Sequence, residues 1–347
     1  MAKQGLTINT ALNLVNNEKS WALCVGSGIS FPLFPLWNEL AKRIVLRCEP
    51  KASGLFEKLS ERMSPEVILQ SAADIAKKDH NAFSKELADT LYEDFFKCLS
   101  VEDKQTVKKC LTCDPGALSE EWGDYLKIIQ RKTSDNLTAL ALAKTILKLR
   151  EKGHAPASIL SFNAEMLLGS LMNAVAHEEY GERKKFFDYI IEPISYHDRN
   201  RIPYYFCHGV MPVPGTNKRA KNTFDADDRL VFLENEYLQL ANSSFSWQSS
   251  AFINTLTTHT VFFVGLSFVD PNIRRWLAWI QEEKQMAFRK KGLTNISSTS
   301  HYWIEKKPGS TTQMRIMESS VSHLGIRIIW IDDWKDVSSV LEKGVFA

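Results

Sequence analysis

Long apolar runs are missing from this chain of 347 residues, as is any strong excess of charge of one sign. No segment approaches the roughly 18 uninterrupted apolar residues that a membrane-spanning helix requires. The first residues, MAKQGLTINTALNLVNNEKS, also lack the apolar centre of a secretory signal. Lys and Arg number 43 and Asp and Glu 41, so charge gives no reason to expect direct binding of nucleic acid or of a membrane surface. We expect a protein that neither crosses a membrane nor is secreted.

Cysteine is sparse as well. The six cysteines are Cys24, Cys48, Cys98, Cys110, Cys113 and Cys207. They are too few for a disulfide scaffold in a chain of this length, and Cys24 and Cys207 lie in apolar runs. We therefore expect the reducing environment of the cytoplasm. With 44% hydrophobic residues, the chain can bury a large core, and its length allows two domains or one domain with an insertion.

The pattern of apolar residues changes twice along the chain. A short apolar run at 21–25 leads into a glycine loop at 26–30, and a helical pattern follows. Between 51 and 150, apolar residues recur at a spacing of three to four with no strand signal between them, which predicts helices. We predict a helical insertion module at 51–150, inserted in a domain formed by residues 1–50 and 151–347.

Beyond residue 150, short β-rich runs alternate with helical stretches. The expected strands are 158–162, 189–194, 203–207, 230–233, 260–266, 302–304 and 326–331. The expected helices are 164–180, 247–258, 271–290 and 311–323. This alternation predicts an α/β fold with a doubly wound, mostly parallel, Rossmann-like sheet.

The glycine loop is the first candidate binding element. A glycine pair directly after a first strand, here Gly26 and Gly28, lets the backbone turn tightly and approach a pyrophosphate. The third glycine of the dinucleotide-binding pattern is absent, because Phe31 occupies its position. A glycine-rich turn with no ligand is an equally good interpretation of this motif alone.

Polar residues follow three later strands, at the edge where open α/β sheets bind ligands. They are Asn163, His208 and Ser267. Each has a structural alternative: Asn163 as the N-cap of the next helix, and His208 as a turn residue satisfied by backbone carbonyls. Asp270, followed by Pro271, is more typical of a helix N-cap than of a catalytic group.

Taken in order, these motifs resemble a known family. They are the loop at 26–30 with Pro32 to Trp37 behind it, Ser161-Phe162-Asn163, Cys207-His208-Gly209, and FVGLSFVDPNIRR at 263–275. The set resembles the bacterial sirtuin-like family that includes NAD-hydrolysing anti-phage defence proteins. The resemblance covers about residues 20–50 and 155–335, and the last motif is its most specific part.

The resemblance implies a sirtuin-like domain with NAD as its substrate. It implies that Gly26, Ser27, Gly28 and Ser30 hold the diphosphate. It also implies that Asn163 and His208 are catalytic, and that Gly265 and Ser267 contact the adenosine end.

The sequence departs from the family pattern at three places. The Asp-Phe-Arg sequence of the sirtuin loop is replaced by Phe34-Pro35-Leu36-Trp37, which, together with the missing zinc cysteines, favours NAD hydrolysis over protein deacylation. Ala164 and Glu165 follow the asparagine, where an aromatic residue and an acid are common, which leaves the contacts of Glu165 open. Deacylating sirtuins carry two cysteine pairs for zinc after the histidine, whereas here a single pair, Cys110 and Cys113, precedes it. We expect no zinc or other metal.

The expected function is a gated NAD hydrolase that releases nicotinamide and ADP-ribose and depletes NAD in anti-phage defence. A constitutive enzyme of this kind would kill its host, so the family resemblance implies a trigger. We expect either self-assembly into a homo-oligomer or a separate protein such as a HerA-type ring ATPase. Two alternatives stay open: a non-catalytic sensor of NAD or ADP-ribose, and a protein deacylase or ADP-ribosyltransferase.

Overall fold

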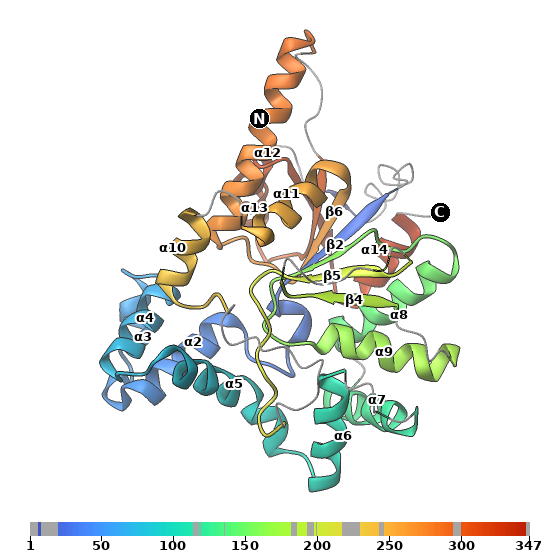
Figure 1. Ribbon diagram of the computed structural model, residues 1–347. Coiled ribbons are helices and arrows are strands. Elements are labelled where there is room, and N and C mark those ends of the chain that lie inside the picture. The colour runs from blue at the N-terminus through green and yellow to red at the C-terminus, as the bar shows by residue number, and fades with distance from the viewer. Residues whose placement is uncertain are drawn as a thin grey trace.

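A parallel sheet forms the centre of the molecule (Figure 1). The computed structural model describes residues 6–7, 20–113, 117, 119–134, 136–181, 186–192, 198, 200–216, 230–242, 246–293 and 300–344. The strands are β1 (Leu6–Thr7), β2 (Trp21–Val25), β3 (Ile159–Ser161), β4 (Phe187–Ile190), β5 (Ile202–Phe206), β6 (Thr260–Val264), β7 (His301–Lys306) and β8 (Ile326–Ile331). Their order is β1-β8-β7-β6-β2-β3-β5-β4, and every neighbouring pair is parallel. The predicted Rossmann-like α/β fold is confirmed.

Helices connect these strands. Before β3 they are η1 (Ser27–Ser30), α2 (Trp37–Cys48), η2 (Pro50–Ala52), α3 (Phe56–Ser60), α4 (Pro65–Ile75), α5 (His80–Lys97), α6 (Val101–Leu111), α7 (Ser119–Thr133) and α8 (Thr138–Glu151). After β3 they are α9 (Leu167–Tyr180), α10 (Glu234–Asn242), α11 (Trp247–Thr258), α12 (Pro271–Lys290), α13 (Thr311–Ser322) and α14 (Asp336–Gly344). None of the helices in the described ranges is long and apolar enough to cross a bilayer.

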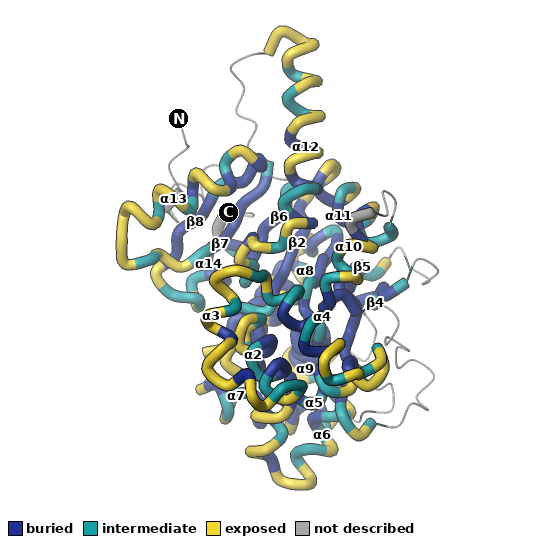
Figure 2. The backbone as a smooth tube through the Cα atoms, turned by 90° about the vertical axis from the view of Figure 1, so that its left-hand side faces the viewer, coloured by how far each residue is buried: buried dark blue, intermediate teal, exposed yellow. Residues whose placement is uncertain are grey.

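The sheet is buried on both faces, which explains its continuous apolar strands. In β2, Trp21, Leu23 and Val25 join one core, whereas Ala22 and Cys24 join the other. Residues of α10 to α13 complete the second core, and those of α9 and α14 belong to the first. Figure 2 shows the dark, buried strands between these helices, and the exposed end of α12 extending beyond them.

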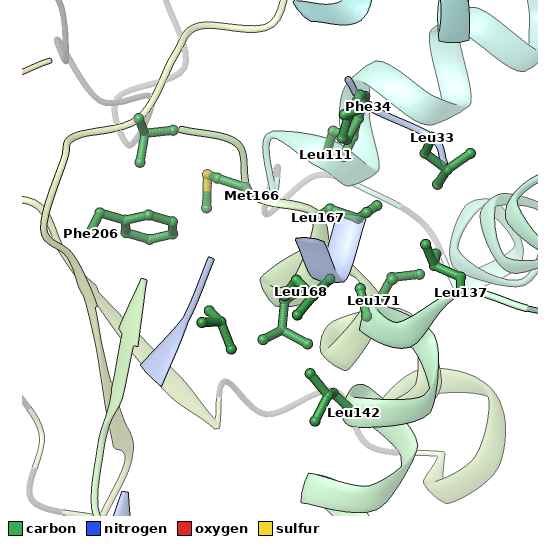
Figure 3. Packing of buried hydrophobic residues seen from close by; sticks show 14 of the residues in the cluster. Leu33, Phe34, Leu111, Leu137, Leu142, Met166, Leu167, Leu168, Leu171 and Phe206 are labelled. Atoms are coloured by element: carbon green, nitrogen blue, oxygen red, sulfur yellow. The ribbon is translucent and has the colours of Figure 1, made fainter. Parts of the chain in front are cut away.

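Helices alone occupy the described part of residues 51–150. Their core is not separate from that of the sheet, because both belong to one cluster of buried side chains. Figure 3 shows this junction: Leu168 of α9 lies among the side chains that link Phe206 of β5 to Leu142 of α8. The division of the chain into an insertion at 51–150 and a surrounding domain stays a prediction.

Two local expectations differ from the structure. Residues 230–233 form no strand, because the backbone N–H groups of Phe232 and Leu233 donate to Glu236 Oε2 at 2.7 and 2.9 Å instead of to a neighbouring strand. Strand β4 covers 187–190 rather than 189–194, and residues 193 and 194 lie outside the described part of the chain.

Candidate functional site

A cavity of about 440 Å³ opens at the carboxyl ends of β2, β3, β5 and β6. In the sheet, β3 lies on one side of β2 and β6 lies on the other, so the strand order reverses at β2. Open α/β sheets bind ligands at such a switch point. Every candidate residue from the sequence lines this cavity: Gly26, Ser27, Gly28, Ser30, Asn163, His208, Gly265 and Ser267. The fold therefore brings the whole predicted set together, although their individual roles stay predictions.

The glycine loop interlocks with the loop after β6. Gly26 N donates to Val264 O at 3.1 Å, and Gly28 N donates to Gly265 O at 3.0 Å. A Cβ atom on Gly28 would lie 2.9 Å from Gly265 Cα, and Gly265 itself has a φ of +70°. Both positions thus require glycine for packing alone. Their phosphate-binding role stays a prediction, and the next element is the short η1 rather than an α-helix.

Asn163 sits in a buried polar network. Its Nδ2 donates to Glu165 Oε1 at 2.8 Å and to Ser30 Oγ at 3.2 Å, and Ser30 Oγ donates to Glu165 Oε1 at 2.6 Å. These bonds fix the amide so that Oδ1 is the remaining acceptor, and Oδ1 is buried with no partner among the described residues. An unsatisfied buried acceptor is costly and rare, so it marks a position for a ligand hydroxyl or water.

The structure shows the contacts of Glu165, which the sequence left open. Its other oxygen accepts the backbone N–H of Leu167, where α9 begins, so the alternative of Asn163 as the N-cap of that helix is wrong. Burial raises the pKa of the Glu165 carboxyl, while the hydrogen bonds from Ser30, Leu167 and Asn163 oppose that rise. The acid two residues after the asparagine was visible in the sequence, but its contact with Ser30 was not.

His208 follows β5 and faces the same cavity. Its ring meets Phe162 and Tyr237 edge-on, at centroid distances of 4.9 and 5.5 Å. The expected turn is present, because Gly209 N donates to Phe206 O. Its Nε2 lies 3.3 Å from Asp270 Oδ2, a contact that the sequence did not predict.

Asp270 has the predicted role of helix N-cap. Its side chain accepts hydrogen bonds from the backbone N–H groups of Asn272 and Ile273 at the start of α12. Pro271 occupies the first helical position, as expected. The proximity of the carboxylate to His208 is an additional feature.

The cavity is also lined by residues that the sequence did not predict. Trp37, Tyr237 and Trp334 supply aromatic surface, and Glu305 supplies a carboxyl at the end of β7. Burial raises the pKa of Glu305 from 4.5 to about 7, with a backbone hydrogen bond from Lys306 opposing the rise. Glu305 follows the buried strand residue Ile304, so the rule that selected Asn163 would have selected it too.

The described residues contain no group of three or more His, Cys, Asp or Glu side chains placed to hold a metal ion. Cys110 and Cys113 lie at the end of α6, and Cys113 Sγ contacts the hydroxyl of Tyr189 at 3.4 Å. The cavity itself offers hydrogen-bonding and proton-transfer groups, namely the amide of Asn163, the imidazole of His208 and the carboxyl groups of Glu165, Asp270 and Glu305.

Comparison with known proteins agrees with this geometry. Residues 171–329 match the family model of the SIR2-like domain, a segment that contains His208 and the motif at 263–275. Over 129 residues the chain is 24% identical to NAD(+) hydrolase ThsA from Enterococcus faecium. That match covers 34% of this chain and 27% of the relative, so the chain spans only about a quarter of the relative's length. The parallel fold and the cavity at its switch point agree with this likeness of residues 171–329 to a SIR2-like domain.

Proposed function

We propose that this protein hydrolyses NAD at the bond between nicotinamide and ribose, giving nicotinamide and ADP-ribose. The observation that carries the proposal is the amide of Asn163, held by Ser30 and Glu165 with a buried, unpartnered Oδ1 in the same cavity as His208. The name of the related protein, an NAD(+) hydrolase, points to the same reaction.

The residues suit the electronic demand of this cleavage. As the carbon–nitrogen bond breaks, nicotinamide leaves with the bonding electrons and the ribose carbon becomes oxocarbenium-like, as in glycoside hydrolysis. The neutral Asn163 amide orients a ribose hydroxyl or the attacking water through Oδ1. His208 accepts the proton that the water loses as its oxygen bonds to the ribose carbon, a role worth about 10² to 10⁴ in rate.

The loops after β2 and β6 supply the binding surface. Gly26, Gly28 and Gly265 let the two loops pack against each other while lining the cavity at this edge. In the proposed complex the diphosphate lies against Gly26, Ser27, Gly28 and Ser30, and the adenosine end lies against Gly265 and Ser267.

The test is direct. Purified protein is incubated with NAD, and nicotinamide and ADP-ribose are quantified by chromatography, with Asn163→Ala alongside. We expect near-complete loss of release in Asn163→Ala. Asn173→Ala is the matched control, because Asn173 Nδ2 also donates a hydrogen bond, to Tyr189 in the adjacent core, but the residue does not line the cavity. Normal turnover by Asn163→Ala would overturn the assignment.

The proposal extends to regulation. A hydrolase that consumed NAD constantly would kill its host, so we propose that activity is gated, by homo-oligomerisation or by a partner such as a HerA-type ring ATPase, and serves anti-phage defence in the cytoplasm. Repeating the assay over a range of protein concentrations tests the first route, since assembly predicts a steep rise in specific activity. A flat concentration dependence with full activity would contradict gating by assembly.

A further inference from the structure

We propose that Asp270 is a positioning residue for His208: it holds the imidazole with its proton on Nε2, which leaves Nδ1 as the nitrogen that takes a proton from substrate or water. This inference rests on the proposed function for its catalytic meaning. Its structural basis is that the Asp270 carboxylate both caps α12 and contacts His208.

The two oxygens of Asp270 are used separately. Oδ1 accepts the backbone N–H of Asn272 at 2.7 Å and of Ile273 at 3.4 Å, which is the helix cap. Oδ2 takes no part in the cap and lies 3.3 Å from His208 Nε2. Both Oδ2 and Nε2 are buried, and neither makes a hydrogen bond among the described residues, so the 3.3 Å contact between them is a close approach of the two groups. Each is therefore available to the other alone within this part of the chain.

The chemistry of the pair selects one tautomer. An ionised carboxylate accepts hydrogen bonds and donates none, so its neighbour Nε2 carries the proton. In neutral imidazole the other nitrogen, Nδ1, is then an acceptor. When Nδ1 takes a proton, the adjacent carboxylate stabilises the imidazolium, as in the pairing of Asp and His in hydrolases.

The surroundings keep both partners in place. Asp270 is anchored by the first turn of α12, where Ile273 and Trp276 are buried in the core. The imidazole is held edge-on by Phe162 and Tyr237. A carboxylate fixed by a helix start and a ring fixed by two aromatic side chains leave little freedom for other arrangements.

Capping alone is the competing explanation, and two substitutions separate it from positioning. Asp270→Ser retains a good capping oxygen but lacks the second oxygen beside His208. Asp270→Asn also retains the cap, but it turns an N–H toward Nε2 and favours the opposite tautomer. Asp79 provides the matched control, because it caps α5 by accepting from Ala82 N at 2.8 Å, away from the cavity. Asp79→Ser and Asp79→Asn therefore measure the effect of a cap change alone.

The decisive measurement is the nitrogen NMR spectrum of the full chain with ¹⁵N-labelled histidine, with His208→Gln identifying the signal of His208. We expect the Nε2–H form in the wild type and a shift to the Nδ1–H form in Asp270→Asn. The same tautomer in both would overturn the inference. Because this readout needs no turnover, it decides the inference even if the wild type releases no nicotinamide, which would be a failure of the proposed function.

Kinetics supply the second readout. We expect both Asp270 variants to lower kcat by about 100-fold, the lower range of a positioned base, with little change in KM. In the His208→Ala background, Asp270→Ser should cause no further loss, since the two residues act as a unit. Full kcat in Asp270→Ser, equal to that of Asp79→Ser, would show that Asp270 is a cap only.

Discussion

The cavity differs from the helical layer, α2 to α8 (residues 37–151), in how its polar groups are paired. In the cavity, Asn163 Oδ1, His208 Nε2 and Asp270 Oδ2 are all buried without a hydrogen bond among the described residues. In the described part of the helical layer, only Gln70 Oε1 has that property. The charged groups there pair near the surface instead, as Arg47 does with Glu86 and Glu93 at 2.9 and 2.8 Å.

This difference separates the region of the proposed chemistry from one whose side chains serve stability. A buried polar atom without a partner costs about 1–3 kcal/mol, so several of them lining one cavity mark it as a place where a ligand or water can bind. In the described part of the helical layer this cost arises at Gln70 alone, and the apolar side chains of the layer continue the core of the sheet. Mutations in the cavity should therefore change rate, whereas mutations in the layer should change stability.

The largest effect is expected from His208→Ala. Loss of the proposed base should lower kcat for NAD cleavage by about 10² to 10⁴, while NAD affinity changes much less. Chromatography of nicotinamide and calorimetric binding measure the two quantities. His323→Ala, an exposed histidine at the end of α13, is the control. Equal losses of rate and affinity would leave His208 with a binding role only.

The sequence predicted which residues line the cavity because its signals are local. Asn163 and His208 each follow an apolar strand, and the carboxyl ends of parallel strands must meet at one edge. The contact between His208 and Asp270 was beyond reach, since it joins side chains 62 positions apart through the geometry of two loops. The prediction of a strand at 230–233 was wrong for a related reason. The apolar pattern is typical of a strand, but the backbone N–H groups of Phe232 and Leu233 donate to the carboxylate of Glu236.

The next largest effect is expected in the helical layer. Leu142 of α8 is fully buried at the junction with α9, so Leu142→Ala should lower the free energy of unfolding by about 2–5 kcal/mol. Below the unfolding transition, the kcat of this variant should match that of the wild type. Leu55→Ala, at a position 46% exposed, controls for the same chemical change and should have a small effect. A lowered kcat in folded Leu142→Ala would break the separation between the two regions.

Glu305 of the cavity wall should make stability depend on pH. Because burial raises its pKa from 4.5 in the unfolded chain to about 7, ionisation costs the folded state free energy. This destabilisation of the folded state is absent below pH 4.5, grows as the pH rises from 4.5 to 7, and is complete above pH 7. Glu305→Gln should therefore be more stable than the wild type at pH 8 by roughly 1–3 kcal/mol and equal to it near pH 4. Denaturant unfolding across this range checks the sign, and a variant less stable at pH 8 would contradict it.

The smallest effect is expected from the ion pairs of the helical layer. Arg47→Met retains the apolar stem but removes the pairs with Glu86 and Glu93. Because the Arg47 side chain is 32% exposed, water screens these pairs, and the free energy of unfolding should fall by no more than about 1 kcal/mol. The difference from the wild type should shrink further in about 1 M salt, where the screening length is about 3 Å. A loss of stability above about 2 kcal/mol that persists in salt would contradict this prediction, because only a buried ion pair behaves in that way. The helical layer would then also depend on buried polar groups, and it would differ from the cavity only in how many it has.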